Sequence, residues 1–217
     1  MTDISKLEIG ILFTLAILFQ FAAVNVNPTL GNIYTGFAIL AAIFIILDPK
    51  RQIHLKSRYN QSSGLALLKG AVSYIILVLG GSYVIVPGVQ AVRNLLSSTT
   101  PVLAQNAVIN NTLFGVGVPV AETFFLFAVA LDILASLFNF EVKRSALTNL
   151  KTWIAIIGLS LLFMFFHLTA KGIGNFETLS LVFFMAIISL ILIIYDESYE
   201  SALYFHIIAN LSALLLI

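Results

Sequence analysis

The stretch that decides the fold is TLSLVFFMAIISLILIIY, residues 178–195, which contains no charged side chain. A helix needs roughly 17–25 mainly apolar residues to cross the hydrocarbon core of a bilayer, and this run is long enough. The bilayer interior offers no hydrogen-bond partners for exposed backbone groups, so a helix is the expected structure there. Because similar apolar runs occur along most of the chain, the sequence predicts an all-helical, polytopic membrane protein.

The composition of the whole chain supports a membrane protein. Of 217 residues, 60% are hydrophobic and 10% are charged, and the mean hydropathy is +1.05. Soluble domains are roughly 45–50% apolar and about 25% charged. The net charge of +1 provides no long-range field to attract a nucleic acid, and the absence of cysteine excludes disulfides, thiolate catalysis and Cys-based metal sites. His, Asp, Glu and Asn must therefore carry any chemistry.

Seven membrane spans are predicted, within one membrane domain that covers residues 1–217. The spans are Ile9–Val26, Gly31–Leu47, Gly70–Val86, Pro119–Phe140, Thr152–Leu168, Thr178–Tyr195 and Ala202–Ile217. Between the third and fourth spans, the segment around Val89–Asn111 alternates polar and apolar residues. This pattern predicts an amphipathic helix that lies along the membrane surface or caps the bundle, with a plain loop as the alternative. Residues 1–112 thus hold the N-terminal spans and the interfacial segment, and residues 113–217 hold the remaining spans.

The basic residues predict the orientation in the membrane. Lys and Arg accumulate in cytoplasmic loops. With seven spans, all basic residues except Arg93 and Lys171 fall on the side of the N-terminus. We therefore expect an integral protein of the cell membrane with a cytoplasmic N-terminus. The loop of residues 196–201 fits this orientation less well, because it would lie inside yet contains acidic residues and no basic one.

Four ionisable side chains fall within the predicted spans, namely Glu122, Asp132, His167 and His206. A charged group near the bilayer centre costs at least about 2.5–3.5 kcal/mol, so such residues are candidates for a functional site. Each also has an ordinary structural interpretation, because a carboxylate can hydrogen-bond within the bundle and a histidine can be satisfied in the interior or reach the headgroups.

Neighbouring residues favour a functional interpretation. Pro119 is expected to place Glu122 in the first helical turn, where unpaired N–H groups stabilise a carboxylate. Asn210 follows His206 by four residues, so both side chains share a helix face. A buried glutamate can act as the general base for water, and imidazole and carboxamide N–H groups can stabilise an oxyanion. Glu122, His167, His206 and Asn210 therefore form a candidate hydrolytic site that requires no metal or other cofactor, although two histidines and a glutamate are also a zinc-binding set.

The predicted depths of these residues leave two arrangements open. Glu122 and His167 fall near the outer boundary, whereas His206 lies only a few residues from the inner start of the last span. A shared site requires the 196–201 turn to dip into the bundle, or the helices to be tilted and shifted. The alternative pairs Asp132 with His206 and Glu122 with His167, which would suit a proton or ion path.

Three motifs stand in order along the C-terminal half: PVAET at residues 119–123, FMFFH at 163–167 and YDESYESALYFHIIAN at 195–210. Together they resemble the CPBP family of glutamate-dependent intramembrane proteases, which includes the CAAX prenyl endopeptidases and the bacteriocin-immunity Abi proteins. The resemblance covers about residues 115–217 and implies a CPBP-like core there. It implies that Glu122 activates water and that His167, His206 and Asn210 polarise the scissile carbonyl and hold the oxyanion. The substrate would be a membrane-associated peptide.

The first motif departs from the family pattern EExxxR, because Thr123 and Phe127 replace the second glutamate and the arginine. Losing both members of a buried ion pair can be nearly neutral for stability, so the fold should be retained. We expect Phe127 to fill the volume of the arginine, and the Thr123 hydroxyl to bond a carbonyl three or four residues earlier. Two alternatives to a protease remain. One is a catalytically degenerate CPBP-fold protein that serves as an accessory subunit or binds a membrane protein partner, and the other is a transporter or a protein with a His-ligated metal or haem.

Overall fold

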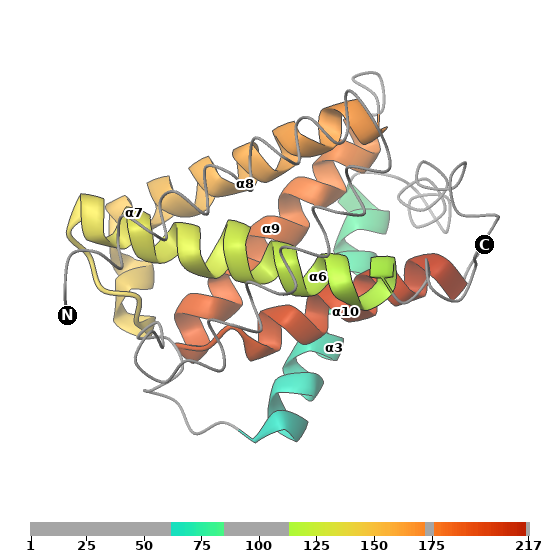
Figure 1. Ribbon diagram of the computed structural model, residues 1–217, viewed down its shortest axis with the longest axis horizontal. Coiled ribbons are helices and arrows are strands. Elements are labelled where there is room, and N and C mark those ends of the chain that lie inside the picture. Colours follow the sequence, from blue (N-terminus) through green and yellow to red (C-terminus); the bar gives the residue numbers. More distant parts are fainter. Residues whose placement is uncertain (1–61, 85–112, 172–175, 216–217) are drawn as a thin grey trace.

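The computed structural model describes residues 62–84, 113–171 and 176–215, and within these ranges every regular element is a helix (Figure 1). The all-helical prediction is confirmed for this part of the chain. The predicted spans Ile9–Val26 and Gly31–Leu47 and the interfacial segment around Val89–Asn111 lie outside it. The elements are α3 (Ser63–Val84), η1 (Leu113–Gly117), α6 (Val118–Ala121), η2 (Glu122–Val129), α7 (Ala130–Phe138), η3 (Arg144–Thr148), α8 (Leu150–Lys171), α9 (Phe176–Asp196) and α10 (Glu200–Leu215).

Three stretches of the described helices are long and apolar enough to cross a membrane: Ser63–Gly80, Gly115–Asp132 and Thr178–Asp196. They overlap the predicted third, fourth and sixth spans, although the first two start earlier in the sequence than predicted, at Ser63 and Gly115. The apolar part of α8, Leu150–Phe165, is shorter. These helices agree with a location in the membrane.

The helix that carries Glu122 starts earlier than expected. Gly117, just before α6, is already in the right-handed helical conformation (φ −64°, ψ −46°), and η1, α6, η2 and α7 follow one another from Leu113 to Phe138. Pro119 has no N–H to donate, and π-helical turns flank α6 on both sides of it. Glu122 therefore lies inside a continuous helix, and the expected stabilisation by a helix N-terminus is wrong. The helix ends in a Schellman motif, with Asn139 at φ 55° and the Phe140 N–H bonded to the Ala135 carbonyl at 2.9 Å.

Helix α9 lies at the centre of the bundle and packs against α3, α8, α10 and η2. Its near-continuous apolar sequence allows it to bury side chains on several faces at once. The largest fully buried apolar side chains come from five elements and include Phe127, Leu131, Ile156, Phe163, Leu190, Ile193, Ile194 and Phe205. Glu122 of η2 and His206 of α10 are buried within this core.

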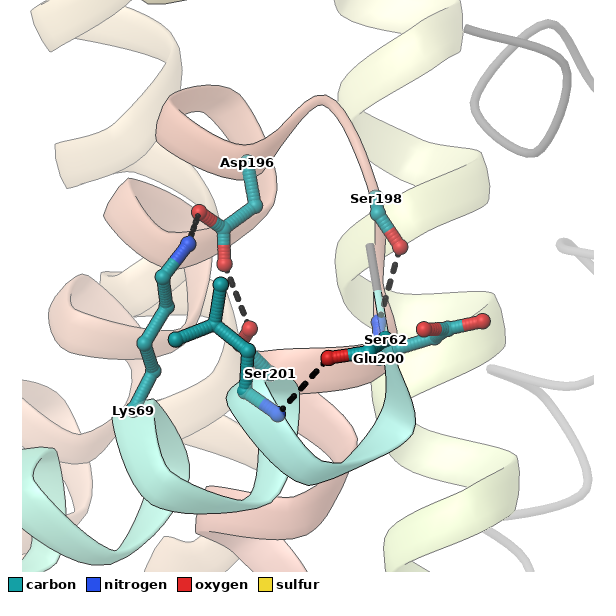
Figure 2. Close-up of polar contacts among 7 residues, drawn as sticks. Ser62, Lys69, Asp196, Ser198, Glu200 and Ser201 are labelled. Atoms are coloured by element: carbon teal, nitrogen blue, oxygen red, sulfur yellow. Dashed lines mark hydrogen bonds and ion pairs between the residues drawn. The ribbon is translucent and has the colours of Figure 1, made fainter. Parts of the chain in front are cut away.

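A buried carboxylate joins α3 to the turn between α9 and α10 (Figure 2). Asp196, only 1% exposed, accepts hydrogen bonds from the Lys69 ammonium group and the Ser201 hydroxyl. Ser198 caps α10, because its hydroxyl accepts a hydrogen bond from the Glu200 N–H at 3.3 Å. A carboxylate out of contact with water is tolerated only when it is paired and hydrogen-bonded. The acidic 196–201 turn thus obtains its positive partner from α3.

One residue further along α3, Gly70 lets α3 and α10 approach closely. A Cβ at Gly70 would lie 2.7 Å from the Phe205 backbone nitrogen and 3.1 Å from the Ser201 carbonyl oxygen. Both atoms belong to the backbone of α10, so neither can move aside as a flexible side chain could. The position of α10 relative to α3 therefore depends on the absence of a side chain at residue 70.

We expect Gly70→Ala to destabilise the protein by about 1–3 kcal/mol, because the added methyl overpacks a helix crossing. The matched control is Gly80→Ala on the same helix, where a Cβ would meet nothing within 4 Å. That change should be neutral or stabilising by up to about 1 kcal/mol, because alanine is the better helix former. Thermal unfolding of the full chain in detergent compares them. Equal melting temperatures for the two variants would contradict the close approach.

Candidate functional site

The structure brings Glu122 of η2 and His206 of α10 into contact. The His206 Nε2 atom lies 3.4 Å from the Glu122 Oε2 atom, and the two residues are 1% and 6% exposed. They are separated by a long stretch of sequence and are joined only because α10 packs against η1, α6 and η2. In such a dry environment the interaction between a carboxylate and an imidazole N–H is stronger than in water.

Thr123 contacts the other nitrogen of the same imidazole. Its hydroxyl oxygen lies 3.1 Å from the His206 Nδ1 atom, and its side chain is fully buried. An ionised Glu122 can only accept a hydrogen bond, so it favours the proton on Nε2. Nδ1 then carries the lone pair and accepts the proton of the Thr123 hydroxyl. Thr123 therefore holds His206 in the tautomer that points its N–H at Glu122.

This contact revises the expectation for Thr123. Its hydroxyl was expected to bond a carbonyl of its own helix, and instead it contacts an imidazole on another helix. The reason is that α10 places a nitrogen within reach of η2, where a hydroxyl can satisfy a buried acceptor. Bonding to an acceptor that would otherwise be buried without a partner is worth about 1–3 kcal/mol.

Two phenylalanines enclose the imidazole of His206. The Phe127 ring centroid lies 6.2 Å from that of His206, and the Phe163 ring meets it edge-on at 6.1 Å. Phe127 and Phe163 also contact one another, with centroids 4.8 Å apart. Phe127 is fully buried, so its ring fills space beside His206 on the same side of η2 as Thr123. The site is thus a polar pair inside an aromatic cage.

His167 reaches this cage through Phe163. Its ring centroid lies 4.5 Å from that of Phe163, and its Nδ1 atom lies 2.9 Å from the Phe163 carbonyl oxygen, one turn earlier on α8. A carbonyl only accepts, so Nδ1 carries the proton and Nε2 of the neutral ring is the acceptor. Asn210 is partly buried one turn beyond His206 on α10. Phe163 therefore lies next to both histidines.

The predicted depths leave open whether His206 pairs with Glu122 or with Asp132, and the structure shows Glu122 as its partner. His206 contacts Glu122 and not the alternative partner Asp132, which lies ten residues further along, roughly 15 Å by helix rise. The 196–201 turn and the start of α10 lie against the helix from Leu113 to Phe138, as the Phe124–Tyr199 edge-to-face contact at 5.7 Å also shows. The arrangement with Asp132 and His206 as a pair is therefore not the one observed.

The described residues contain no group of three His, Asp or Glu side chains placed to hold a metal ion. The observed polar contacts of His206 go to Glu122 and Thr123. These contacts join a carboxylate, an imidazole and a hydroxyl.

Sequence reasoning missed two features of this region. The bond from Thr123 to His206 had no signal in the sequence, because it depends on how two distant helices pack. The Lys69–Asp196–Ser201 cluster did have one, since Lys69 stands at the edge of a predicted span and Asp196 begins an acidic loop that lacks a basic residue. A buried acidic turn requires a cation from elsewhere, and Lys69 was available.

Replacing Thr123 by valine tests its role in fixing the tautomer, because valine keeps the shape and removes the hydroxyl. We expect ¹⁵N NMR of the histidine side chains to show a single Nε2-protonated form of His206 in the native protein. Thr123→Val should give a mixture of tautomers, and Thr123→Ser should restore the single form. His206→Gln identifies the resonance among the three histidines. Unchanged His206 shifts in Thr123→Val would refute the assignment.

Comparison of the chain with protein-family models, with curated proteins and with solved structures finds no match. The likeness to the CPBP family accordingly stands on the three sequence motifs alone, and function has to be inferred from the side chains of the site.

Proposed function

We propose that the chain is an intramembrane endopeptidase of the CPBP type, in which Glu122 activates water for attack on a membrane-associated peptide. The contact between Glu122 and His206, with Thr123 behind it, is the observation that carries the proposal. It joins a buried carboxylate to a histidine that comes from another motif of the resemblance. In this proposal the chain forms a seven-span bundle in the cell membrane, with its N-terminus in the cytoplasm and its CPBP-like core in residues 113–217.

In the proposed reaction Glu122 changes between its ionised and its protonated form. Glu122 takes a proton from water, whose oxygen bonds to the peptide carbonyl carbon and converts the carbonyl oxygen into an oxyanion. The carboxamide N–H of Asn210 stabilises that charge, and the Nε2–H of His206 does so once Glu122 has taken the proton; each donor is worth about 2.7–4 kcal/mol in favourable cases. His167 contributes a donor to the oxyanion only when its proton moves from Nδ1, which faces the Phe163 carbonyl, to Nε2. Glu122 then returns the proton to the leaving amine.

A specific observation also favours a second candidate, a degenerate CPBP-fold protein that binds a membrane protein partner. Thr123 and Phe127 replace the family's second glutamate and arginine, are both fully buried, and both contact His206. A site whose charged pair has been exchanged for a hydroxyl and a well-packed ring can keep its fold without its activity.

Glu122→Gln separates the two candidates, because the amide keeps the shape but cannot accept the proton of water. Purified protein in lipid nanodiscs is incubated with a library of lipid-anchored peptides, including prenylated ones, and products are identified by mass spectrometry. We expect native cleavage that falls by about 10²–10⁴-fold in Glu122→Gln and by about 10²–10³-fold in Asn210→Ala.

The matched control is Asp132→Asn, the same carboxylate-to-amide change ten residues along the same helix, which should retain cleavage. A chelator should have no effect. Cleavage that survives Glu122→Gln would make the glutamate structural, and chelator-sensitive cleavage would indicate a His-ligated metal. A native protein without any cleavage would favour the degenerate, partner-binding protein.

A further inference from the structure

Helix α8 carries an exposed apolar stripe along its length. Leu150, Ile154, Ile157, Leu161 and Phe165 are all exposed and are spaced three or four residues apart, so they lie on one helix face. In Figure 1, α8 runs along one edge of the molecule. The stripe spans roughly 22 Å by helix rise, whereas one leaflet of the hydrocarbon core is about 15 Å thick. It is long enough to contact acyl chains over their full length.

The stripe begins at a turn with the character of a membrane–water interface. Trp153, the single tryptophan of the chain, is 38% exposed, and its indole N–H donates a hydrogen bond to the Leu147 carbonyl at 2.7 Å. Leu137 and Phe138 at the end of α7 are also exposed. Tryptophan concentrates at this depth because its ring is apolar and its N–H is polar.

Two cations stand at the same turn. The Arg144 guanidinium carbon lies 4.1 Å from the centre of the Tyr195 ring, and the Lys151 ammonium donates a hydrogen bond to the Phe138 carbonyl at 3.1 Å. Both side chains are exposed yet held in place. The stacked guanidinium keeps N–H groups at its edge available to an anion.

Of the six other charged side chains that the structure describes at this end, four form ion pairs. Lys143 pairs with Glu141, and Lys69 pairs with Asp196. Within the described residues, the observed ion pairs involve neither Arg144 nor Lys151. Glu197 and Glu200 are on the neighbouring α9–α10 turn. The excess positive charge of the α7–α8 turn, which we define as residues 139–151, is therefore concentrated on Arg144 and Lys151 beside the apolar stripe.

We propose that the α7–α8 turn binds an acidic phospholipid, with Arg144 and Lys151 contacting its phosphate and the α8 stripe contacting its acyl chains. A phospholipid combines an anionic group with long apolar chains. It therefore matches both the two basic side chains and the apolar stripe of this surface. This inference depends on the membrane location of the chain and is independent of any proteolytic activity. It implies that the turn selects acidic over zwitterionic lipid, with a gain of about fivefold for each basic side chain near the headgroups.

Trp153 provides the probe, because bromine atoms on acyl chains quench only a nearby indole. The full-length protein is placed in phosphatidylcholine nanodiscs that contain an equal minor fraction of brominated phosphatidylglycerol or brominated phosphatidylcholine. We expect stronger quenching by the acidic lipid, corresponding to a local enrichment of about fivefold or more, and a loss of this preference at high salt. The double variant Arg144→Gln/Lys151→Gln should quench equally with both lipids.

The matched control is Lys143→Gln, which removes a neighbouring lysine that is already paired with Glu141 and should keep the preference. Equal quenching by the two lipids in the native protein would overturn the proposal. Absence of quenching by either lipid would also overturn it, because the stripe would then be covered by protein. A preference that disappears in Lys143→Gln as well would indicate diffuse attraction instead of a site on Arg144 and Lys151. Circular dichroism of each variant verifies folding.

Discussion

The buried carboxylate of Asp196 is the constraint on which the arrangement of the C-terminal helices depends. It lies at the end of α9, where burial requires a cation and a hydrogen-bond donor, and it obtains them from Lys69 of α3 and Ser201 of α10. Three helices are thereby joined at one point. Gly70 follows Lys69 and allows the α10 backbone to approach α3 at Phe205, the residue before His206. The electrostatic requirement at Asp196 and the steric one at Gly70 thus act together on the helix that carries His206.

The surroundings of His206 show how a buried imidazole is satisfied without a charged pair at positions 123 and 127. A glutamate and an arginine would need each other, because either alone would leave a buried charge. Thr123 and Phe127 need no charged partner, and each has a separate role against the imidazole. The hydroxyl satisfies Nδ1, and the ring supplies packing. Both residues lie in the π-helical segment η2, and π-helical turns are frequent at functional sites.

The helical class and the approximate positions of the helices could be predicted, because apolar runs such as residues 178–195 reflect the length of a bilayer crossing and little else. The contact of Glu122 with His206 could be proposed only from the order of motifs, since the expected depths placed them apart. What sequence could not supply was the packing of α10, which depends on the close approach at Gly70 and on the pairing of Lys69 with Asp196. The start of the Glu122 helix also differs from the prediction, because a proline favours the first turn of a helix, whereas the π-helical turns around Pro119 extend the helix back to Leu113.

Two groups of polar side chains lie in different environments. Glu122, Thr123 and His206 are buried in contact with one another, away from water and bulk ions. Arg144 and Lys151 are exposed at a helix end, where the surrounding dielectric weakens any single interaction and salt screens it. A molecule that reaches the first group must leave water, whereas one that binds at the second need not. Tyr195 and Asp196, adjacent at the end of α9, link the two groups. Tyr195 contacts Arg144, and Asp196 pairs with Lys69 and accepts a hydrogen bond from Ser201 of α10. The surface that faces lipid headgroups and the helix that carries His206 are therefore anchored on the same turn of α9.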